Sequence, residues 1–187
     1  DMAEEIIVVS GLPRSGTSML MRMLEAGGVP VMVDHVRTAD ADNPRGYYEL
    51  EKVKQIKQDV GWLAQAPGKV FKMVSLLLFQ LPETYTYKII FMRRNMPEIL
   101  ASQRQMLERM GKPASATGDA QMGQMFAKHL QDIEQWLRGR PNMSVLYLVY
   151  HEVIAAPRAS VAAVAQFLGR PLNLDQMAAV VEPVLYR

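Results

Sequence analysis

Runs of mainly apolar residues alternate with amphipathic stretches along the chain. Such runs, typical of strands buried on both faces of a parallel sheet, occur at residues 6–9, 29–33, 69–75, 88–93 and 144–150. Helical spacing of apolar residues occurs at 19–24, 49–63, 95–110, 122–137, 157–168 and 174–181. Gln103 is the polar exception on the apolar face of the stretch 95–110. The alternation predicts an α/β fold with a mostly parallel sheet, helices on both faces and a ligand site at the carboxyl ends of the strands.

The first predicted strand continues into a turn bounded by Gly11 and Gly16, and then into a helix. Such a turn leaves backbone N–H groups free at a helix N-terminus, where the helix dipole favours an anion. The glycine spacing and the hydroxyl of Ser18 match a nucleotide-binding P-loop, but Thr17 occupies the lysine position and the basic residue is Arg14. The missing lysine argues against ATP or GTP, whose γ-phosphate travels with Mg²⁺.

This loop resembles the first motif of the sulfotransferases that use 3′-phosphoadenosine 5′-phosphosulfate (PAPS). The family motif P-[KR]-[ST]-G-[TS]-[TS] is matched by Pro13, Arg14, Ser15, Gly16, Thr17 and Ser18. The resemblance implies a P-loop NTPase-like fold of three layers, in which these residues bind the nucleotide. It also implies that PAPS is the sulfuryl donor, that the 3′,5′-bisphosphate PAP is the product, that the acceptor is a hydroxyl or amine of a small molecule, and that no metal is needed.

A second motif follows the predicted strand 88–93. In the same family a buried strand ends in an Arg-Asn or Arg-Asp pair, with a serine eight residues after the arginine, and these two side chains hold the 3′-phosphate. Arg94 and Ser102 match this pattern. An arginine fork and a hydroxyl suit a dianionic phosphate. We expect the two side chains to meet, because Ser102 lies in the second turn of a helix that starts near Pro97.

A third, weaker match extends the resemblance to residue 169. Family members carry Tyr-Glu-Asp-Leu, then a proline and a Phe-Leu-Gly helix end; this chain has Tyr-His-Glu-Val at 150–153, Pro157, and Phe-Leu-Gly at 167–169. Because His151 stands where the family usually has glutamate, we interpret this segment as structural. The closest likeness is to the compact bacterial sulfotransferases.

Sulfuryl transfer requires cations at the oxygens around the sulfur and a base for the acceptor's proton. Arg14 and Lys72, late in the predicted strand 69–75, are the candidate cations. The family uses histidine or glutamate as the base. Here the candidates are Glu49, at the end of an Asn-Pro-Arg-Gly-Tyr-Tyr-Glu segment similar to one in bacterial relatives, and His35 in the polar loop before it. An unperturbed glutamate has a pKa of about 4.3, so burial must raise the pKa of Glu49 for this role.

Composition limits the remaining possibilities. The chain has 187 residues, of which 49% are hydrophobic and 21% charged, so we expect one globular domain over residues 1–187. A net charge of +2 gives no reason to expect nucleic acid or a membrane surface as a partner. The absence of cysteine excludes disulfides and thiolate metal sites. No signal peptide or membrane anchor is visible, which predicts a cytoplasmic protein.

Two functions from other classes stay open. One is a P-loop nucleotide or metabolite kinase, to which the missing lysine is the objection. The other is a nucleotide-binding protein without turnover, which two departures from the family pattern allow. Lys72 resembles the lysine of the family's Lys-Asp-Pro segment, but Met73 and Val74 replace Asp-Pro, and His151 replaces a glutamate. The sequence determines neither the acceptor nor the oligomeric state.

Overall fold

A parallel β-sheet forms the centre of the computed structural model, which describes residues 4–35, 37–112 and 116–182. Its strands are β1 (Ile6–Gly11), β2 (Val70–Val74), β3 (Tyr87–Arg93) and β4 (Met143–Val149). They lie in the order β2-β1-β3-β4, and each adjacent pair is parallel. Because β1 is an inner strand, the turn that follows it lies between the ends of β2 and β3.

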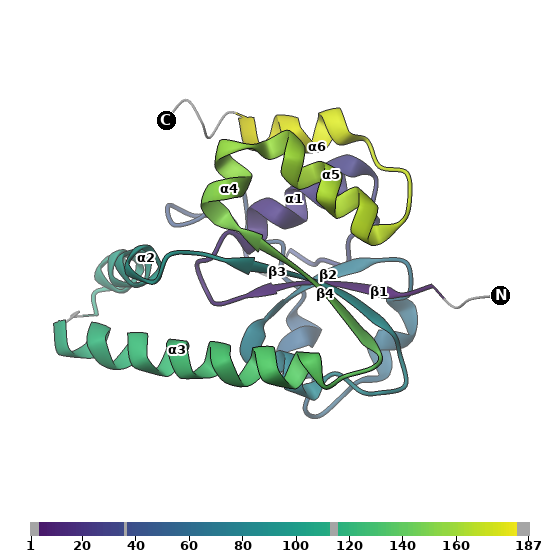
Figure 1. Ribbon diagram of the computed structural model, residues 1–187. Coiled ribbons are helices and arrows are strands. Elements are labelled where there is room, and N and C mark those ends of the chain that lie inside the picture. Colours follow the sequence, from purple (N-terminus) through teal and green to yellow (C-terminus); the bar gives the residue numbers. More distant parts are fainter. Residues whose placement is uncertain (1–3, 36, 113–115, 183–187) are drawn as a thin grey trace.

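Helices cover both faces of this sheet (Figure 1). One face carries α1 (Thr17–Gly27), α4 (Tyr150–Ala155), α5 (Pro157–Leu168) and α6 (Leu174–Val181). The other face carries α3 (Ala116–Arg138) and the short 3₁₀ helices η1 (Glu51–Gln55), η2 (Gly61–Gln65) and η3 (Ser75–Gln80). Helix α2 (Met96–Arg109) follows β3 and packs against α3. This arrangement confirms the predicted three-layer α/β fold.

Two hydrophobic cores explain why β1 is apolar at successive positions. Ile7 and Val9 pack against α1, α5 and α6, whereas Ile6 and Val8 pack against the 3₁₀ helices and α3. Side chains alternate between the two faces of a strand, so a strand covered on both sides must be apolar throughout. Each fully buried side chain of this size contributes about 1.5–3 kcal/mol relative to an exposed one, which fixes the strand between its two layers.

The strand predicted at residues 29–33 is reduced to a single bridge. Val31 pairs with Val70 at the edge of the sheet, and the N–H of Val70 donates to the carbonyl of Pro30 at 2.9 Å. Pro30 has no N–H to extend such a ladder. The segment therefore follows β2 for one pairing only.

The helix predicted at residues 49–63 is also wrong, because the chain forms η1 and η2 instead. Asp59 stabilises the break between them. Its carboxylate accepts a hydrogen bond from the N–H of Gly61 at 2.8 Å, and its carbonyl accepts one from the indole N–H of Trp62 at 3.0 Å. The apolar side chains still reach the core, so the spacing indicated burial correctly but not the type of helix.

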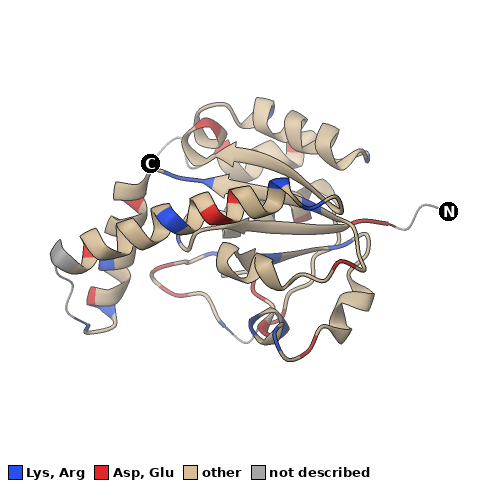
Figure 2. Cartoon of the chain, turned by 60° about the horizontal axis from the view of Figure 1, so that its bottom comes forward, with Lys and Arg blue, Asp and Glu red and all other residues tan. Residues whose placement is uncertain are grey.

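The outer side of α3 is a solvated surface. Residues of both charge signs follow one another along this helix (Figure 2). Lys128 and Asp132 form an ion pair one turn apart, at 3.0 Å. Among the described helices, none combines the length and the apolar character needed to span a membrane.

The carboxyl ends of the strands bring the predicted site residues together. Arg14 and Ser18 follow β1, Lys72 lies near the end of β2, and Arg94 follows β3. After β4 the chain enters α4 at Tyr150, where the sequence had predicted that the strand continues and had not predicted a helix. A parallel sheet places all these positions at one edge, as expected for its ligand site.

Candidate functional site

The loop between β1 and α1 is held in a conformation that suits an anion. Gly16 has φ +98°, and a Cβ atom there would lie 2.6 Å from the ring of Tyr150, so only glycine fits. Arg14 also has a positive φ, +64°, which is uncommon for a residue other than glycine. The buried hydroxyl of Ser15 donates to the carbonyl of Leu12 at 2.6 Å and closes the loop. The first N–H groups of α1 have no partners within the helix, so they remain available to a ligand.

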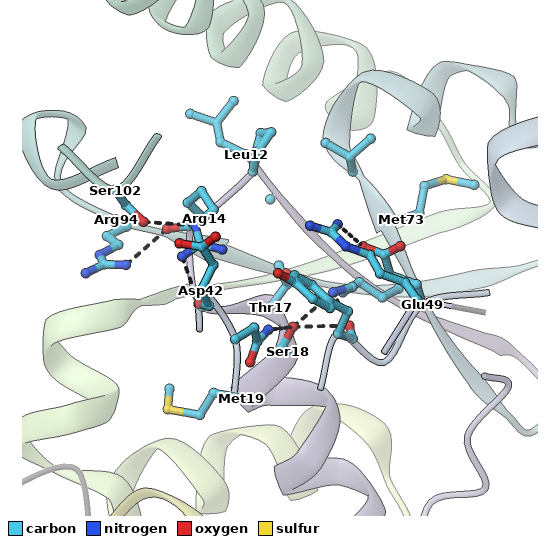
Figure 3. A pocket seen from close by; sticks show the side chains of 18 of the residues that line it. Leu12, Arg14, Thr17, Ser18, Met19, Asp42, Glu49, Met73, Arg94 and Ser102 are labelled. Carbon is cyan, nitrogen blue, oxygen red and sulfur yellow. Dashed lines mark hydrogen bonds and ion pairs between the residues drawn. The ribbon is translucent and has the colours of Figure 1, made fainter. Parts of the chain in front are cut away.

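Arg14 connects this loop to two other segments (Figure 3). Its Nε donates to the hydroxyl of Ser102 in α2 at 2.8 Å, and its Nη2 donates to the carbonyl of Asp42 at 3.1 Å. Its own carbonyl accepts a hydrogen bond from Nη1 of Arg94 at 3.0 Å. Ser102 thus meets Arg14, whereas the sequence had predicted that Arg94 reaches it. The guanidinium of Arg94 is instead engaged by the Arg14 carbonyl and by Glu98.

Arg94 has two further partners. Its Nε pairs with Glu98 at 3.1 Å, and its guanidinium lies over the ring of Tyr150 at 4.2 Å. Glu98 also contacts a ring nitrogen of His151 at 2.8 Å. The hydrogen bond from Arg94 lowers the pKa of Glu98. These contacts orient the Arg94 side chain beside the cavity that it lines.

Lys72 and Ser18 meet on the other side of the loop. The Lys72 ammonium donates to the hydroxyl of Ser18 at 3.0 Å and also contacts the carbonyl of Tyr47. Ser18 donates to the same carbonyl at 3.1 Å and accepts a hydrogen bond from the amide of Asn43 at 3.0 Å. Burial lowers the pKa of Lys72 to about 8, although nearby Glu49 opposes this shift. The ammonium is therefore mostly charged at neutral pH but titrates only slightly above it.

Glu49 lies beside this lysine and is ion-paired. Its carboxylate is 2.9 Å from Arg37 and 3.3 Å from Lys54, and its side chain is 18% exposed. Arg37 in turn lies over the ring of Tyr47 at 3.5 Å. Arg37 donates to Oε1, whereas Oε2 is buried and has no hydrogen-bond partner among the described residues, although Lys54 lies 3.3 Å from it.

The segment before Glu49 is an ordered part of the site. A carboxylate oxygen of Asp40 accepts hydrogen bonds from the hydroxyl of Tyr47 at 2.6 Å and from the N–H groups of Asp42 and Asn43 at 2.9 and 3.0 Å. The two ends of this segment are joined by a hydrogen bond from the N–H of Asp34 to the carbonyl of Glu49. This loop therefore presents Asp42, Asn43 and Tyr47 to the P-loop and the start of α1.

These groups surround a cavity of about 640 Å³. The predicted site residues that line it are Pro13, Arg14, Gly16, Thr17, Ser18, Glu49, Lys72, Arg94 and Ser102. Ser15 is buried behind the loop and His35 is exposed, and neither lines the cavity. In Figure 3, Arg94 and Ser102 lie on one side of Ser18, and Glu49 and Met73 lie on the other. The structure thus brings the predicted cations together around one cavity, which Glu49 also lines and His35 does not.

Other lining residues escaped the sequence reasoning: Arg22, Arg37, Asn43, Gln103 and Tyr150. Tyr150 belongs to the segment interpreted as structural, and its ring supports Gly16 as well as lining the cavity. A polar residue on an otherwise apolar helix face was the available signal for Gln103, and a long polar loop was the signal for Asn43. Nothing in the sequence distinguishes Arg22.

The sequence matches the model of the sulfotransferase domain over residues 4–186. The chain belongs to this sulfotransferase family. Its family resemblance, predicted from the P-loop motif, is therefore confirmed. A comparison with curated proteins finds no match. Among the described residues of this sulfotransferase, no three His, Asp or Glu side chains are grouped in a way that could hold a metal ion.

Solved structures of other sulfotransferases share the fold. STF1 from Mycobacterium tuberculosis has a TM-score of 0.66 and 18% identity, with 96% of this chain and 71% of that one covered. STF9 from Mycobacterium avium has a TM-score of 0.59 and 13% identity, with coverage of 100% and 69%. Mouse SULT7A1 complexed with PAP has a TM-score of 0.55 and 18% identity, and the match covers 95% of this chain and 62% of that one. At these identities the likeness shows the fold alone.

Proposed function

We propose that this sulfotransferase uses PAPS as its donor, releases PAP and transfers the sulfuryl group to a hydroxyl or amine of a small molecule. The observation that carries this proposal is that Arg14, from the loop between β1 and α1, and Lys72, from β2, line one cavity together with the first residues of α1. The structures of mouse SULT7A1 and of retinol dehydratase, both with PAP, support the choice of donor.

The residues of the cavity fit such a nucleotide. Arg14, Ser18 and Lys72 would hold the 5′-phosphosulfate together with the first N–H groups of α1, because all these groups donate hydrogen bonds and two are cations. Arg94 and Ser102, on the other side of the loop, would hold the 3′-phosphate. A Cβ atom at position 16 would meet the ring of Tyr150, so glycine lets the loop keep the turn that precedes the first N–H groups of α1.

The transfer exchanges one bond for another at sulfur. The acceptor's oxygen or nitrogen forms a bond to sulfur while the bond from sulfur to the 5′-phosphate oxygen breaks, and the acceptor's proton passes to Glu49. Lys72 and Arg14 stabilise the negative charge that develops on the departing phosphate. The oxygen of Glu49 that accepts this proton is Oε2, which accepts no hydrogen bond from any described residue. His35 is the weaker candidate for the base, because it lies outside the cavity lining.

Thermal unfolding with different nucleotides tests this function. PAP at 100 times its dissociation constant is expected to add about 2.7 kcal/mol to the free energy of unfolding. AMP, which lacks the 3′-phosphate, serves as the matched ligand and is expected to stabilise the protein less. Stabilisation by ATP with Mg²⁺ but not by PAP would instead identify a kinase-like site. Formation of PAP from PAPS with an added acceptor then distinguishes an enzyme from a nucleotide-binding protein.

A further inference from the structure

Gln103 lines the cavity from α2 with a polar atom that has no partner. It shares a helix face with Ile99, which is buried, and Met106, which also lines the cavity. Its side-chain oxygen Oε1 is buried and accepts no hydrogen bond from any described residue. An unpaired amide oxygen destabilises a folded protein, and buried polar groups are normally hydrogen-bonded. A leucine would complete the apolar stripe without this cost, so the glutamine points to a ligand.

Gln103 lines the cavity but not the open hollow beside it. Ser102 and Arg94 line both, and Glu98 and Arg104 line the hollow with them on the polar side of α2. Consecutive helical residues point about 100° apart, given 3.6 residues per turn. Gln103 therefore differs from its neighbour Ser102 in lining the cavity alone.

Apolar side chains from other elements line the same cavity. Leu50 and Val53 come from the region of η1, Met73 from β2 and Leu77 from η3, and the four belong to one hydrophobic cluster. The candidate base Glu49 also lines this cavity. The lining of one cavity thus combines these apolar side chains with Gln103, whose Oε1 has no hydrogen-bond partner among the described residues.

We propose that Gln103 selects the acceptor, and that the acceptor is an apolar molecule with two hydrogen-bond donors. One donor is the hydroxyl or amine that receives the sulfuryl group, and the other is an O–H or N–H that donates to Gln103 Oε1. The inference rests on the proposed function, because it assigns the acceptor of that reaction. Apolar walls discriminate weakly between molecules of similar shape, whereas a buried acceptor oxygen discriminates strongly against a ligand that has no hydrogen to donate.

Binding of matched naphthols to the PAP-loaded protein tests the assignment. The probes are 6-hydroxy-2-naphthol and 6-methoxy-2-naphthol, which share the apolar body and one hydroxyl but differ in the second donor. Wild type is expected to bind the dihydroxy probe roughly tenfold more tightly, as measured by calorimetry. Gln103→Leu is expected to remove this preference, and Gln103→Glu, which retains the acceptor oxygen, to keep it. Gln124→Leu, at an exposed position of α3 outside the lining of both the cavity and the hollow, is the matched control and is expected to behave as wild type.

Stability and PAP binding separate this role from a structural one. Gln103→Leu is expected to unfold at the same or a higher temperature, because it replaces an unpaired polar group with an apolar one. A lower melting temperature with an unchanged probe preference would mean that Gln103 only supports the fold. An equal loss of PAP affinity in this variant would assign the oxygen to the nucleotide instead.

The remaining outcomes distinguish the two proposals. If PAP binds but neither naphthol does, or if both bind equally to wild type, the two-donor acceptor is wrong and the proposed donor stands. If PAP does not bind, the proposed function fails first.

Discussion

The two sides of the cavity hold their cations in different ways. On one side, Arg14 and Arg94 are joined through the Arg14 carbonyl and pair with Ser102 and Glu98. On the other side, half-buried Lys72 contacts Ser18, and its pKa is lowered by burial to about 8. Arginine stays charged at any pH that the protein tolerates, whereas this lysine can lose its proton slightly above neutrality.

This difference separates anchoring from chemistry. The arginine side offers a constant charge and planar donor forks, which suit a phosphate that stays in place throughout a reaction. The lysine side lies next to Glu49, so it combines a titratable cation with a candidate base. Substitution of Arg94 should therefore affect affinity. Substitution of Arg14, which also faces the departing phosphate in our proposal, should affect turnover as well, and substitutions on the lysine side should affect turnover or pH dependence.

The largest effect is expected from the carboxylate on the lysine side. Glu49→Gln keeps the size of the side chain but cannot accept a proton. It should lower turnover by roughly 10²–10⁴, the usual range for removal of a general base. Its dissociation constant for PAP should stay close to that of wild type. Steady-state kinetics with a verified acceptor and calorimetry with PAP measure the two quantities.

His35→Ala is the control for this prediction. It should leave turnover unchanged, because His35 is exposed and outside the cavity lining. Loss of turnover in His35→Ala with normal activity in Glu49→Gln would make the histidine the base. If both variants keep full activity, the base must be sought in Lys72 or in the substrate.

The arginine side should give the next largest effect. Arg94→Ala and Ser102→Ala each remove a proposed contact to the 3′-phosphate, and hydrogen bonds to charged groups contribute on the order of 1.5–3 kcal/mol. PAP affinity should fall by roughly 10- to 100-fold, while AMP affinity changes much less. Because Ser102 also accepts a hydrogen bond from Arg14, its variant should affect AMP more than the Arg94 variant does. Equal losses for PAP and AMP in both variants would remove these residues from the 3′-phosphate site.

The same comparison shows what the sequence could predict. The strand-to-helix turn with Gly11 and Gly16 is local, so its spacing alone predicted the anion cradle and the residues that border it. Parallel strands run in the same direction, so their carboxyl ends lie along one edge of the sheet. This geometry predicted that Lys72 and Arg94 lie at the same edge. Pairings across the sheet depend on side-chain reach, and no sequence pattern indicated that Arg14 rather than Arg94 contacts Ser102.

The elements that were predicted wrongly have local causes. Residues 49–63 have helical apolar spacing, but the hydrogen bonds of Asp59 to the next residues favour two 3₁₀ turns. The ion pairs of Glu49 with Arg37 and Lys54 depend on how this broken segment folds back over the sheet. Helical spacing of apolar residues indicates which residues are buried. It does not show where a side chain such as that of Asp59 hydrogen-bonds to the backbone and interrupts a helix.

The smallest effect concerns pH and tests whether Lys72 is the titrating cation. Its lowered pKa of about 8 in the free protein means that binding of an anion requires uptake of a proton above that pH. PAP affinity should be constant between about pH 7 and 8, where phosphate groups are already ionised, and then fall by at most tenfold per pH unit. Calorimetry from pH 7 to 9.5 measures this. Lys72→Met should bind PAP more weakly but without the fall.

Stability of the ligand-free protein should change with pH in the opposite direction. The unfolded chain has a lysine of ordinary pKa, about 10.4, so between pH 8 and 10.4 the unfolded state binds more protons than the folded state. The contribution of Lys72 to the free energy of unfolding therefore rises with pH across this window, because the buried ammonium loses its charge. Denaturant unfolding of wild type and Lys72→Met at pH 8 and 9.5 isolates that contribution as the difference between the two proteins. For PAP binding, the contradicting result is an affinity that falls with pH as steeply in Lys72→Met as in wild type. Another group would then titrate, and the contrast between the two sides of the cavity would no longer rest on Lys72.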